Sequence, residues 1–349
     1  MANLATALDN WRASRSGVRR GPRMRFPRFK GRRACLSCRF TTGTFGLAKH
    51  DRRHVRLPRI GLVRTHESTR KLARHVERGT ARIRSATISH RAGRWFVSFS
   101  VEIIRAARTP ARPDAVIGVD LGLSHLAVLS TGQVIPNPRH LELAQRTLRR
   151  LQRQAARRQG PDRGTQRSPS ARWRRTQDKV SRLHTSITNA RGDGLNKLTS
   201  KLATTFGTIV LEDLNVAGML RNRRLARHIA GAGWGELRRQ LQYKVLCHGS
   251  RLLLADRWYP SSKTCSDCGV AKAKLRLSER TFTCDSCGMR RDRDLNAARN
   301  LAMLCPPTVG GRHETSPRET HVRPTSGGQR VLPREDPYRS VRANTATAR

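Results

Sequence analysis

The stretch Val116-Ile117-Gly118-Val119-Asp120-Leu121-Gly122 places one carboxylate inside an otherwise apolar segment. Such a segment predicts a buried β-strand, and Leu126-Ala127-Val128-Leu129 predicts a second strand soon after it. Apolar runs at 208–212 and 251–255 predict two more strands. Helical composition is found at about 141–151, 171–206 and 234–246. Strands that alternate with helices predict an α/β architecture with inserted helices.

Three carboxylates stand at the edges of these elements. Asp120 lies within the first strand, Glu212 ends the third, and Asp294 lies where an alanine-rich helix begins. A carboxylate in an apolar strand is costly to bury without a partner. Two or three converging carboxylates can hold Mg²⁺ or Mn²⁺, and a pair of such ions can promote phosphodiester cleavage. Each acid alone also fits a helix cap or a salt bridge, and Asp292 competes with Asp294 for the third position.

Four cysteines have the spacing of a metal site. Cys265-x2-Cys268 is followed, after fifteen residues, by Cys284-x2-Cys287. Two such pairs are typical of a four-thiolate zinc site. Because four thiolates leave no open position for water, we expect this zinc to be structural.

The charge of the chain indicates a polyanionic partner. The 349 residues include 71 Lys and Arg against 24 Asp and Glu, which gives a formal net charge of +47. Such an excess argues against an ordinary metabolic enzyme and indicates nucleic acid as the partner. Aromatic residues make up only 5% of the chain, so extensive platforms for base stacking are not expected.

The segments on either side of the α/β unit differ from it in composition. Residues 82–103 alternate, are rich in β-formers and contain a short turn at 90–94, which predicts a hairpin in a small β-barrel-like domain. Residues 306–349 lack an apolar period and predict a disordered tail. The sequence has no run of 18 apolar residues and no apolar N-terminal run, so we expect a cytoplasmic protein without a membrane segment.

The order of the motifs resembles that of a known family. Four motifs follow one another, with the expected zinc ribbon between the last two: Gly118-Val119-Asp120-Leu121-Gly122, Val210-Leu211-Glu212-Asp213-Leu214-Asn215, Tyr259-Pro260-Ser261-Ser262-Lys263-Thr264-Cys265-Ser266-Asp267-Cys268-Gly269 and Asp292-Arg293-Asp294-Leu295-Asn296-Ala297-Ala298-Arg299-Asn300. Together they resemble TnpB, the OrfB-type proteins of bacterial insertion sequences, which are similar to the ancestors of the type V CRISPR nucleases. The resemblance runs from about residue 8 to about residue 304.

This resemblance implies an RNase H-like (RuvC) nuclease domain with a zinc ribbon, preceded by a partial wedge β-barrel. It implies Asp120, Glu212 and Asp294 as catalytic carboxylates that bind Mg²⁺ or Mn²⁺. It also implies RNA-guided DNA cleavage linked to transposition, in which a guide RNA from the element pairs with target DNA while the protein recognises duplex shape and a short flanking motif. Candidate backbone contacts lie in two basic strips, at 12–56 and 146–182. From these strips we select Arg28, Lys30, Arg32, Arg33, Arg149, Arg150, Arg157, Arg158, Arg174 and Arg175.

The expected domains follow from the same comparison. They are a basic arm with a partial wedge domain at 1–108, the nuclease domain at 109–262, the zinc ribbon at 263–290, the last nuclease segment at 291–305 and the tail at 306–349. Because family members begin with a further strand and a helical recognition region, we expect an N-terminally shortened chain or a misplaced start. We expect the protein in the bacterial cytoplasm, associated with the nucleoid.

Two alternative functions remain open from the sequence. A shortened N-terminal lobe favours a non-catalytic accessory or regulatory protein that binds RNA or DNA through the same basic surfaces. A transposase that joins DNA strands would use the same carboxylate chemistry, although the family resemblance does not imply it.

Overall fold

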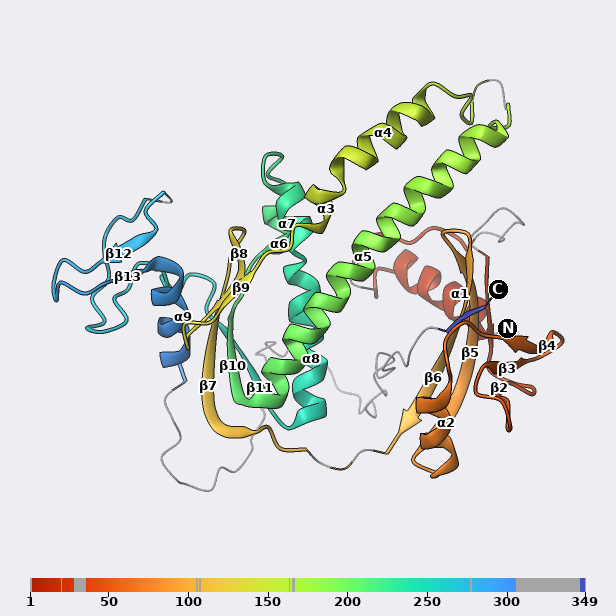
Figure 1. Cartoon of the computed structure of the whole chain (residues 1–349), viewed down its shortest axis with the longest axis horizontal. Helices are drawn as coiled ribbons and strands as arrows, with labels where there is room; N and C mark the ends of the chain where they lie inside the picture. The colour runs from red at the N-terminus through yellow and green to blue at the C-terminus, as the bar shows by residue number, and fades with distance from the viewer. Residues whose placement is uncertain are drawn as a thin grey trace. The chain divides into compact units, whose positions relative to one another are not determined.

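A computed structural model describes residues 2–19, 21–27, 36–104, 106, 108–162, 164, 167–276, 278–305 and 346–348. The chain divides into two compact units, one of residues 1–104 with 332–349 and one of residues 105–331 (Figure 1). The tail predicted at 306–349 lies outside the described residues, except for β14 (Ala346–Ala348), which pairs antiparallel with β6 (Arg94–Ile103).

The first unit is built on a β-hairpin. β5 (Ala81–Arg91) pairs with β6, which confirms the hairpin predicted at 82–103. The turn between the strands uses Ala92 and Gly93 at positive φ (50° and 77°), as two-residue hairpin turns require. The other elements of this unit are α1 (Ala2–Arg15), β1 (Ser37–Phe40), β2 (Gly46–Leu47), β3 (His54–Leu57), β4 (Gly61–Arg64) and α2 (Arg70–Glu77).

Two antiparallel sheets share the core of the first unit. Their strand orders are β1-β5-β6-β14 and β2-β3-β4. Val55 and Leu57 of β3 pack with Val97 and Phe99 of β6 in this core. The closure of these sheets into a partial barrel stays a prediction, and helix α1 was not predicted from the sequence.

The second unit contains a five-stranded mixed sheet of order β11-β10-β7-β8-β9. Neighbouring strands β7, β8 and β9 are antiparallel, whereas β10 runs parallel to β7 and β11 parallel to β10. The strands are β7 (Arg112–Leu121), β8 (His125–Leu129), β9 (Val134–Pro136), β10 (Phe206–Glu212) and β11 (Arg251–Ala255). The α/β class and the four predicted strands are confirmed, and β9 is an addition.

Helices flank this sheet on both faces. The helices of the second unit are α3 (His140–Leu143), α4 (Gln145–Ala156), α5 (Ala171–Thr205), α6 (Val216–Met219), α7 (Ala226–Ala232), α8 (Trp234–His248) and α9 (Arg293–Met303). Helices α4 and α5 form a helical hairpin that extends away from the sheet (Figure 1). The hydroxyl of Ser170 caps α5 by accepting the Trp173 N–H at 3.2 Å. None of the helices in the described residues is long and apolar enough to cross a membrane.

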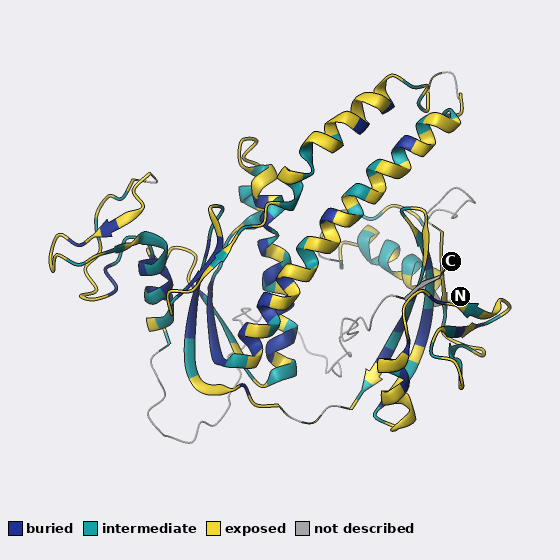
Figure 2. Ribbon diagram, in the orientation of Figure 1, coloured by how far each residue is buried: buried dark blue, intermediate teal, exposed yellow. Residues whose placement is uncertain are grey.

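One face of the sheet is covered by α5 and α8. Ile117 and Val119 of β7 are fully buried in the largest hydrophobic core, together with leucines of both helices (Figure 2). Side chains alternate between the two faces of a strand. The residues between and after these two, Gly118 and Asp120, therefore face the opposite side of the sheet.

Helix α9 covers that opposite side. Val210 of β10 packs there with Leu301 of α9, and Glu212 follows Val210 on the same face. Gly118 brings α9 unusually close to β7. A Cβ at this position would lie 1.9 Å from the carbonyl oxygen of Ala298. Only glycine allows this approach.

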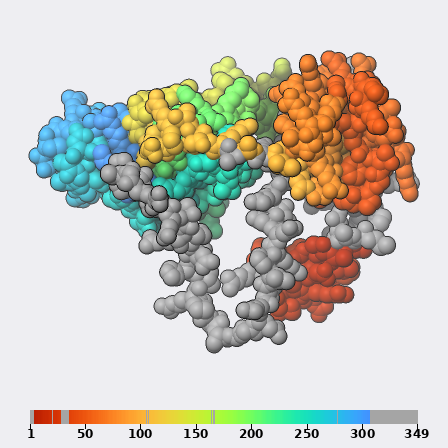
Figure 3. Space-filling model, turned by 90° about the horizontal axis from the view of Figure 1, so that it is seen from below, coloured from red at the N-terminus to blue at the C-terminus, as the bar shows by residue number. Residues whose placement is uncertain are grey.

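The segment before α9 forms a small lobe with its own core. β12 (Thr281–Thr283) and β13 (Arg290–Asp292) pair antiparallel. Phe282 of β12 is fully buried and packs with Cys265 and Cys284. In Figure 3 this lobe and α9 form the blue end of the second unit.

Candidate active site and metal centre

The structure brings Asp120 and Glu212 to neighbouring positions. Their strands β7 and β10 are parallel neighbours, in which Val119 pairs with Leu211. Each carboxylate comes one residue after this pair, at the carboxyl end of its strand. Both carboxylates are half-buried. In open α/β sheets this edge is the usual place for a ligand site.

Asp294 reaches the same region from the first turn of α9. Its side chain is 16% exposed and forms an ion pair with Arg293 at 3.3 Å. Burial raises the pKa of Asp120 well above its usual value, and the nearby charges of Glu212 and Asp294 raise it further, while Arg293 opposes them. The charge of Asp294 therefore acts directly on Asp120.

Glu212 is held by a neighbouring hydroxyl. Ser261 is 5% exposed, and its Oγ donates to Oε1 of Glu212 at 2.8 Å. Burial raises the pKa of Glu212, the hydrogen bond from Ser261 lowers it, and the charge of Asp294 raises it. Ser261 thus holds Oε1 of Glu212, whereas Oε2 takes no part in this hydrogen bond.

Asp292 and Asp294 have different partners in the structure. Oδ1 of Asp292 accepts the N–H groups of Asp294 and Leu295, each at 3.0 Å, and so caps α9. Both acids raise the pKa of Asp120, Asp294 more than Asp292, whereas the pKa of Glu212 is raised by Asp294. Asp292 thus caps the helix, and Asp294 has no capping bond of this kind.

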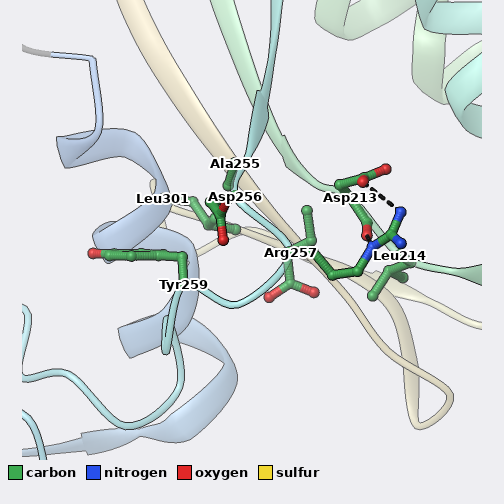
Figure 4. Close-up of a pocket in the computed structure, with 8 residues that line it drawn as sticks. Asp213, Leu214, Ala255, Asp256, Arg257, Tyr259 and Leu301 are labelled. Carbon is green, nitrogen blue, oxygen red and sulfur yellow. Dashed lines mark hydrogen bonds and ion pairs between the residues drawn. The ribbon is translucent and has the colours of Figure 1, made fainter.

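Asp213, next to Glu212, is turned toward two arginines. Its Oδ2 accepts Nη2 of Arg257 at 2.6 Å, and its Oδ1 accepts Nη1 of Arg238. The bond from Arg238, followed by that from Arg257, lowers the pKa of Asp213. A pocket in this region (Figure 4) is lined by Glu212, Asp213, Leu214, Ala255, Asp256, Arg257, Tyr259 and Leu301.

Asp120, Glu212 and Asp294 offer the ligand type of a divalent cation, whereas among the described residues the four cysteines are the group whose ligand atoms are close enough together to hold a metal. Carboxylate oxygens are the ligands that Mg²⁺ and Mn²⁺ prefer. Like charges that raise the pKa of Asp120 would be offset by a cation between them. The three carboxylates therefore have the chemistry of a hard-cation site.

The four predicted cysteines come together. Their sulfur atoms all lie within 4.8 Å of one another, with Cys265 and Cys284 buried and Cys268 and Cys287 exposed. The Sγ atoms of Cys265 and Cys287 are 3.7 Å apart, and those of Cys268 and Cys284 are 3.5 Å apart. These distances exclude disulfides and fit the edge of about 3.8 Å that a tetrahedron with Zn–S bonds of about 2.3 Å has. The cluster can therefore hold a metal ion.

The basic residues chosen from the sequence have different surroundings. Arg28, Lys30, Arg32 and Arg33 lie outside the described residues. On the helical hairpin, the exposed members are Arg149, Arg150, Arg157, Arg174 and Arg175. Arg158 is half-buried, and its Nη1 donates to the carbonyl of Arg172 at 2.8 Å and to Thr176. Arg158 therefore joins the end of α4 to α5.

Sequence reasoning missed several residues around the carboxylates. Ser261 binds Glu212, and Arg257 binds Asp213. Asn296 and Asn300 of α9 are fully buried and bind the loop before the first cysteine pair. Their spacing of four residues on an alanine-rich helix was a usable signal, because it predicts a shared helix face.

Comparison with known proteins identifies the family. A profile of the OrfB_IS605 family, described as "Probable transposase", matches residues 98–223, and one described as "Cas12f1-like, TNB domain" matches residues 234–301. A Mycobacterium tuberculosis protein named "Putative RNA-guided DNA endonuclease Rv2885c" is 39% identical over 326 residues, which cover 89% of this chain and 68% of that protein. The chain belongs to the OrfB/TnpB family. The family predicted from the motif order is confirmed.

Two further matches have lower sequence identity. The Escherichia coli protein "Putative RNA-guided DNA endonuclease InsQ" is 34% identical over 297 residues, which cover 80% of this chain and 68% of InsQ. A solved structure titled "Cryo-EM structure of CRISPR-Cas12f Ternary Complex" has 17% identity and a TM-score of 0.41, and the match covers 86% of this chain and 70% of that one.

Proposed function

We propose that this chain is the RNA-guided DNA endonuclease of an insertion sequence, with a catalytic site formed by Asp120, Glu212 and Asp294. One observation carries the proposal. Two adjacent strands and one helix bring these carboxylates to one face of the sheet, close enough for Glu212 and Asp294 to raise the pKa of Asp120. Membership in a family whose relatives are named as RNA-guided DNA endonucleases supports it.

We also infer that the second unit has the RNase H-like (RuvC) fold. Three antiparallel strands followed by two parallel ones, in the order β11-β10-β7-β8-β9, support this assignment. So does the placement of helices on both faces of the sheet. The fold supplies a rigid edge on which the carboxylates stand, as a precise site requires.

The reaction that fits this site is metal-dependent phosphodiester hydrolysis. Asp120, Glu212 and Asp294 would hold Mg²⁺ or Mn²⁺, which supplies an activated water and offsets charge on the leaving oxygen. The protein's own part is positional. β7 and β10 fix the first two carboxylates, Ser261 orients Glu212, and the close packing of α9 on Gly118 fixes Asp294.

The four cysteines would hold a structural Zn²⁺. Four thiolates suit zinc, and such a lobe is too small to be stable through its core alone. Phe282, which packs with Cys265 and Cys284, is the largest buried side chain of that core. The lobe precedes α9 directly, so we assign it the task of holding the start of that helix.

Guide RNA and target DNA are the proposed partners. Exposed arginines on both helices of the α4–α5 hairpin, Arg149 and Arg150 on one and Arg174 and Arg175 on the other, support contacts with phosphate backbones. The net charge of +47 supports a large polyanionic partner. A bacterial cytoplasmic location at the nucleoid would follow from these partners.

Charge-removing variants test the proposal. Asp120→Asn, Glu212→Gln and Asp294→Asn should each lower DNA cleavage by at least a hundredfold in Mg²⁺ while guide RNA and DNA still bind, because the lost charge serves the metal. Asp292→Asn is the matched control, since asparagine also caps helices. It should keep most of the activity. Full activity in Asp294→Asn, or loss only in Asp292→Asn, would contradict the assignment.

A further inference from the structure

We propose that Asn296, Asn300 and Ser261 are positioning residues that fix Glu212 relative to Asp294 and link both to the cysteine cluster. The inference rests on the proposed nuclease function for its effect on catalysis. Its structural part stands on hydrogen bonds among buried groups. None of these three residues is a proposed ligand of either metal.

The two asparagines bind one loop from one face of α9. Nδ2 of Asn300 donates to the carbonyl oxygens of Ser261 at 2.7 Å and Thr264 at 2.6 Å. Nδ2 of Asn296 also donates to the Thr264 carbonyl, at 2.6 Å, and its Oδ1 accepts the N–H of Ser266 at 2.9 Å. Helix α9 therefore holds both ends of the segment 261–266.

The amide group is needed at both positions because these side chains have no access to water. Asn296 is 0% exposed and Asn300 2% exposed. A buried amide persists where its hydrogen bonds are made. Both bonds of Asn300 use its Nδ2 as the donor to a carbonyl. An aspartate at position 300 has the same shape, but its carboxylate oxygens would face the two carbonyl oxygens, and neither group could donate a hydrogen bond.

The same loop reaches the catalytic carboxylates in one step. Ser261, whose carbonyl binds Asn300, donates its hydroxyl to Oε1 of Glu212. Asn300 and Asp294 lie on one rigid helix. The route from Asp294 to Glu212 thus runs through α9, Asn300 and Ser261, which sets the spacing of the two carboxylates independently of the sheet.

The loop also reaches the cysteine cluster. Cys265 lies between Thr264 and Ser266, and both of these neighbours bind Asn296 through their backbone groups. A shift of Cys265 would therefore move the partners of Asn296. In this way, loss of metal from the cysteine cluster would change the position of Glu212, although the cluster takes no part in the chemistry.

Hydrogen exchange of the full chain tests the structural part. Asn300→Asp should increase exchange of the segment 259–266 by at least tenfold and leave α5 unchanged. The control is Asn222→Ala, an exposed asparagine whose Oδ1 accepts only a local N–H, from Arg224 at 3.0 Å. It should change neither segment. Unchanged exchange of 259–266 in Asn300→Asp would overturn the proposal. Ser261→Ala, which removes only a hydroxyl, should fold normally and raise exchange near Glu212.

Single-turnover cleavage at saturating guide and DNA tests the functional part. Ser261→Ala should lower the rate on the order of tenfold to a hundredfold, as expected for a lost bond to a charged group. The double variant Ser261→Ala/Asn300→Ala should be no slower than Ser261→Ala, since Asn300 acts on Glu212 through Ser261. DNA affinity should stay within about twofold. If the rate losses of the two single variants multiply in the double variant, Asn300 does not act through Ser261, and the proposed route is wrong. Absence of cleavage by the wild type would refute the nuclease function, while exchange would still decide the positioning role.

Discussion

At Gly118, the absence of a side chain allows two elements of the site to pack closely. Strand β7 and helix α9 approach so closely there that a Cβ would lie 1.9 Å from Ala298 O and 2.6 Å from Ala302 N. The helix is thereby drawn onto the face of the sheet that carries Asp120. The glycine of the first motif is needed for this packing. The packing in turn brings helix α9 to the face that carries the aspartate two residues later.

A methyl group at Gly118 should separate these elements. We expect Gly118→Ala to lower the free energy of unfolding by about 1–3 kcal/mol, as overpacking does, and to abolish cleavage because Asp294 moves away from Asp120. Urea unfolding and a cleavage assay measure both effects. Gly235→Ala is the control, since nothing lies within 4 Å of a Cβ at this exposed site on α8. It should be neutral or stabilising. Equal effects of the two variants would contradict the packing role.

At the scale of elements, α9 connects the sheet, the cysteine lobe and the carboxylates. Asp292 begins this helix as its cap, Asp294 faces Asp120, and the buried Asn296 and Asn300 bind the loop 261–266. The eleven-residue helix and its cap thus serve three different tasks. Its start is held by the lobe that the cysteines organise.

Metal removal should therefore act at a distance. Cys265→Ser should lower the zinc content from about one per chain to near zero and expose 263–300 to proteolysis, because the lobe has little core of its own. Cleavage should fall as α9 loosens. Elemental analysis and limited proteolysis measure the outcome, with Cys247→Ser, outside the cluster, as the control. Retained metal and unchanged proteolysis in Cys265→Ser would argue against a structural zinc.

The contact between α5 and α8 contains a buried lysine. Lys244 is 5% exposed, and its Nζ donates to Asn196, Thr199 and Ser200 at 2.7–2.8 Å. Burial lowers its pKa to about 8 from 10.5. Between these two pH values the unfolded chain binds more protons than the folded one, so this residue adds stability as the pH rises.

The pH dependence of unfolding tests this effect. Relative to Lys244→Met, the wild type should gain up to about 3 kcal/mol between pH 8 and pH 10.5. Urea unfolding of both proteins at several pH values gives the difference, and the variant serves as the control for other titrating groups. A difference that stays constant over this range would show that the oxygen partners keep Lys244 charged.

Some of this site was predictable from the sequence and some was not. Asp120 and Glu212 stand out because acids are rare in apolar strands, and the cysteine spacing specified its own cluster. Asp292 and Asp294 could not be separated, because both stand at the start of one helix. Ser261 gave no signal in a polar loop. Because the basic strip contains many arginines, its sequence did not distinguish Arg158, which binds α5 from the end of α4, from the exposed arginines around it.

At the scale of the whole molecule, basic residues greatly outnumber acidic ones, 71 against 24. The chain carries a net charge of +47, and exposed arginines line the α4–α5 hairpin. Such a field attracts nucleic acid without regard to sequence. The selectivity of the proposed enzyme would then come from guide pairing, and its chemistry from the three carboxylates.

Guided cleavage is the measurement that tests this account most directly. The purified chain, loaded with RNA from its own element, is incubated with plasmid DNA that carries either a matched or a mismatched target. We predict that the matched plasmid alone is cut, that cutting requires Mg²⁺ or Mn²⁺, and that Asp120→Ala abolishes it. Absence of cutting under all of these conditions, or equal cutting by wild type and Asp120→Ala, would contradict the account.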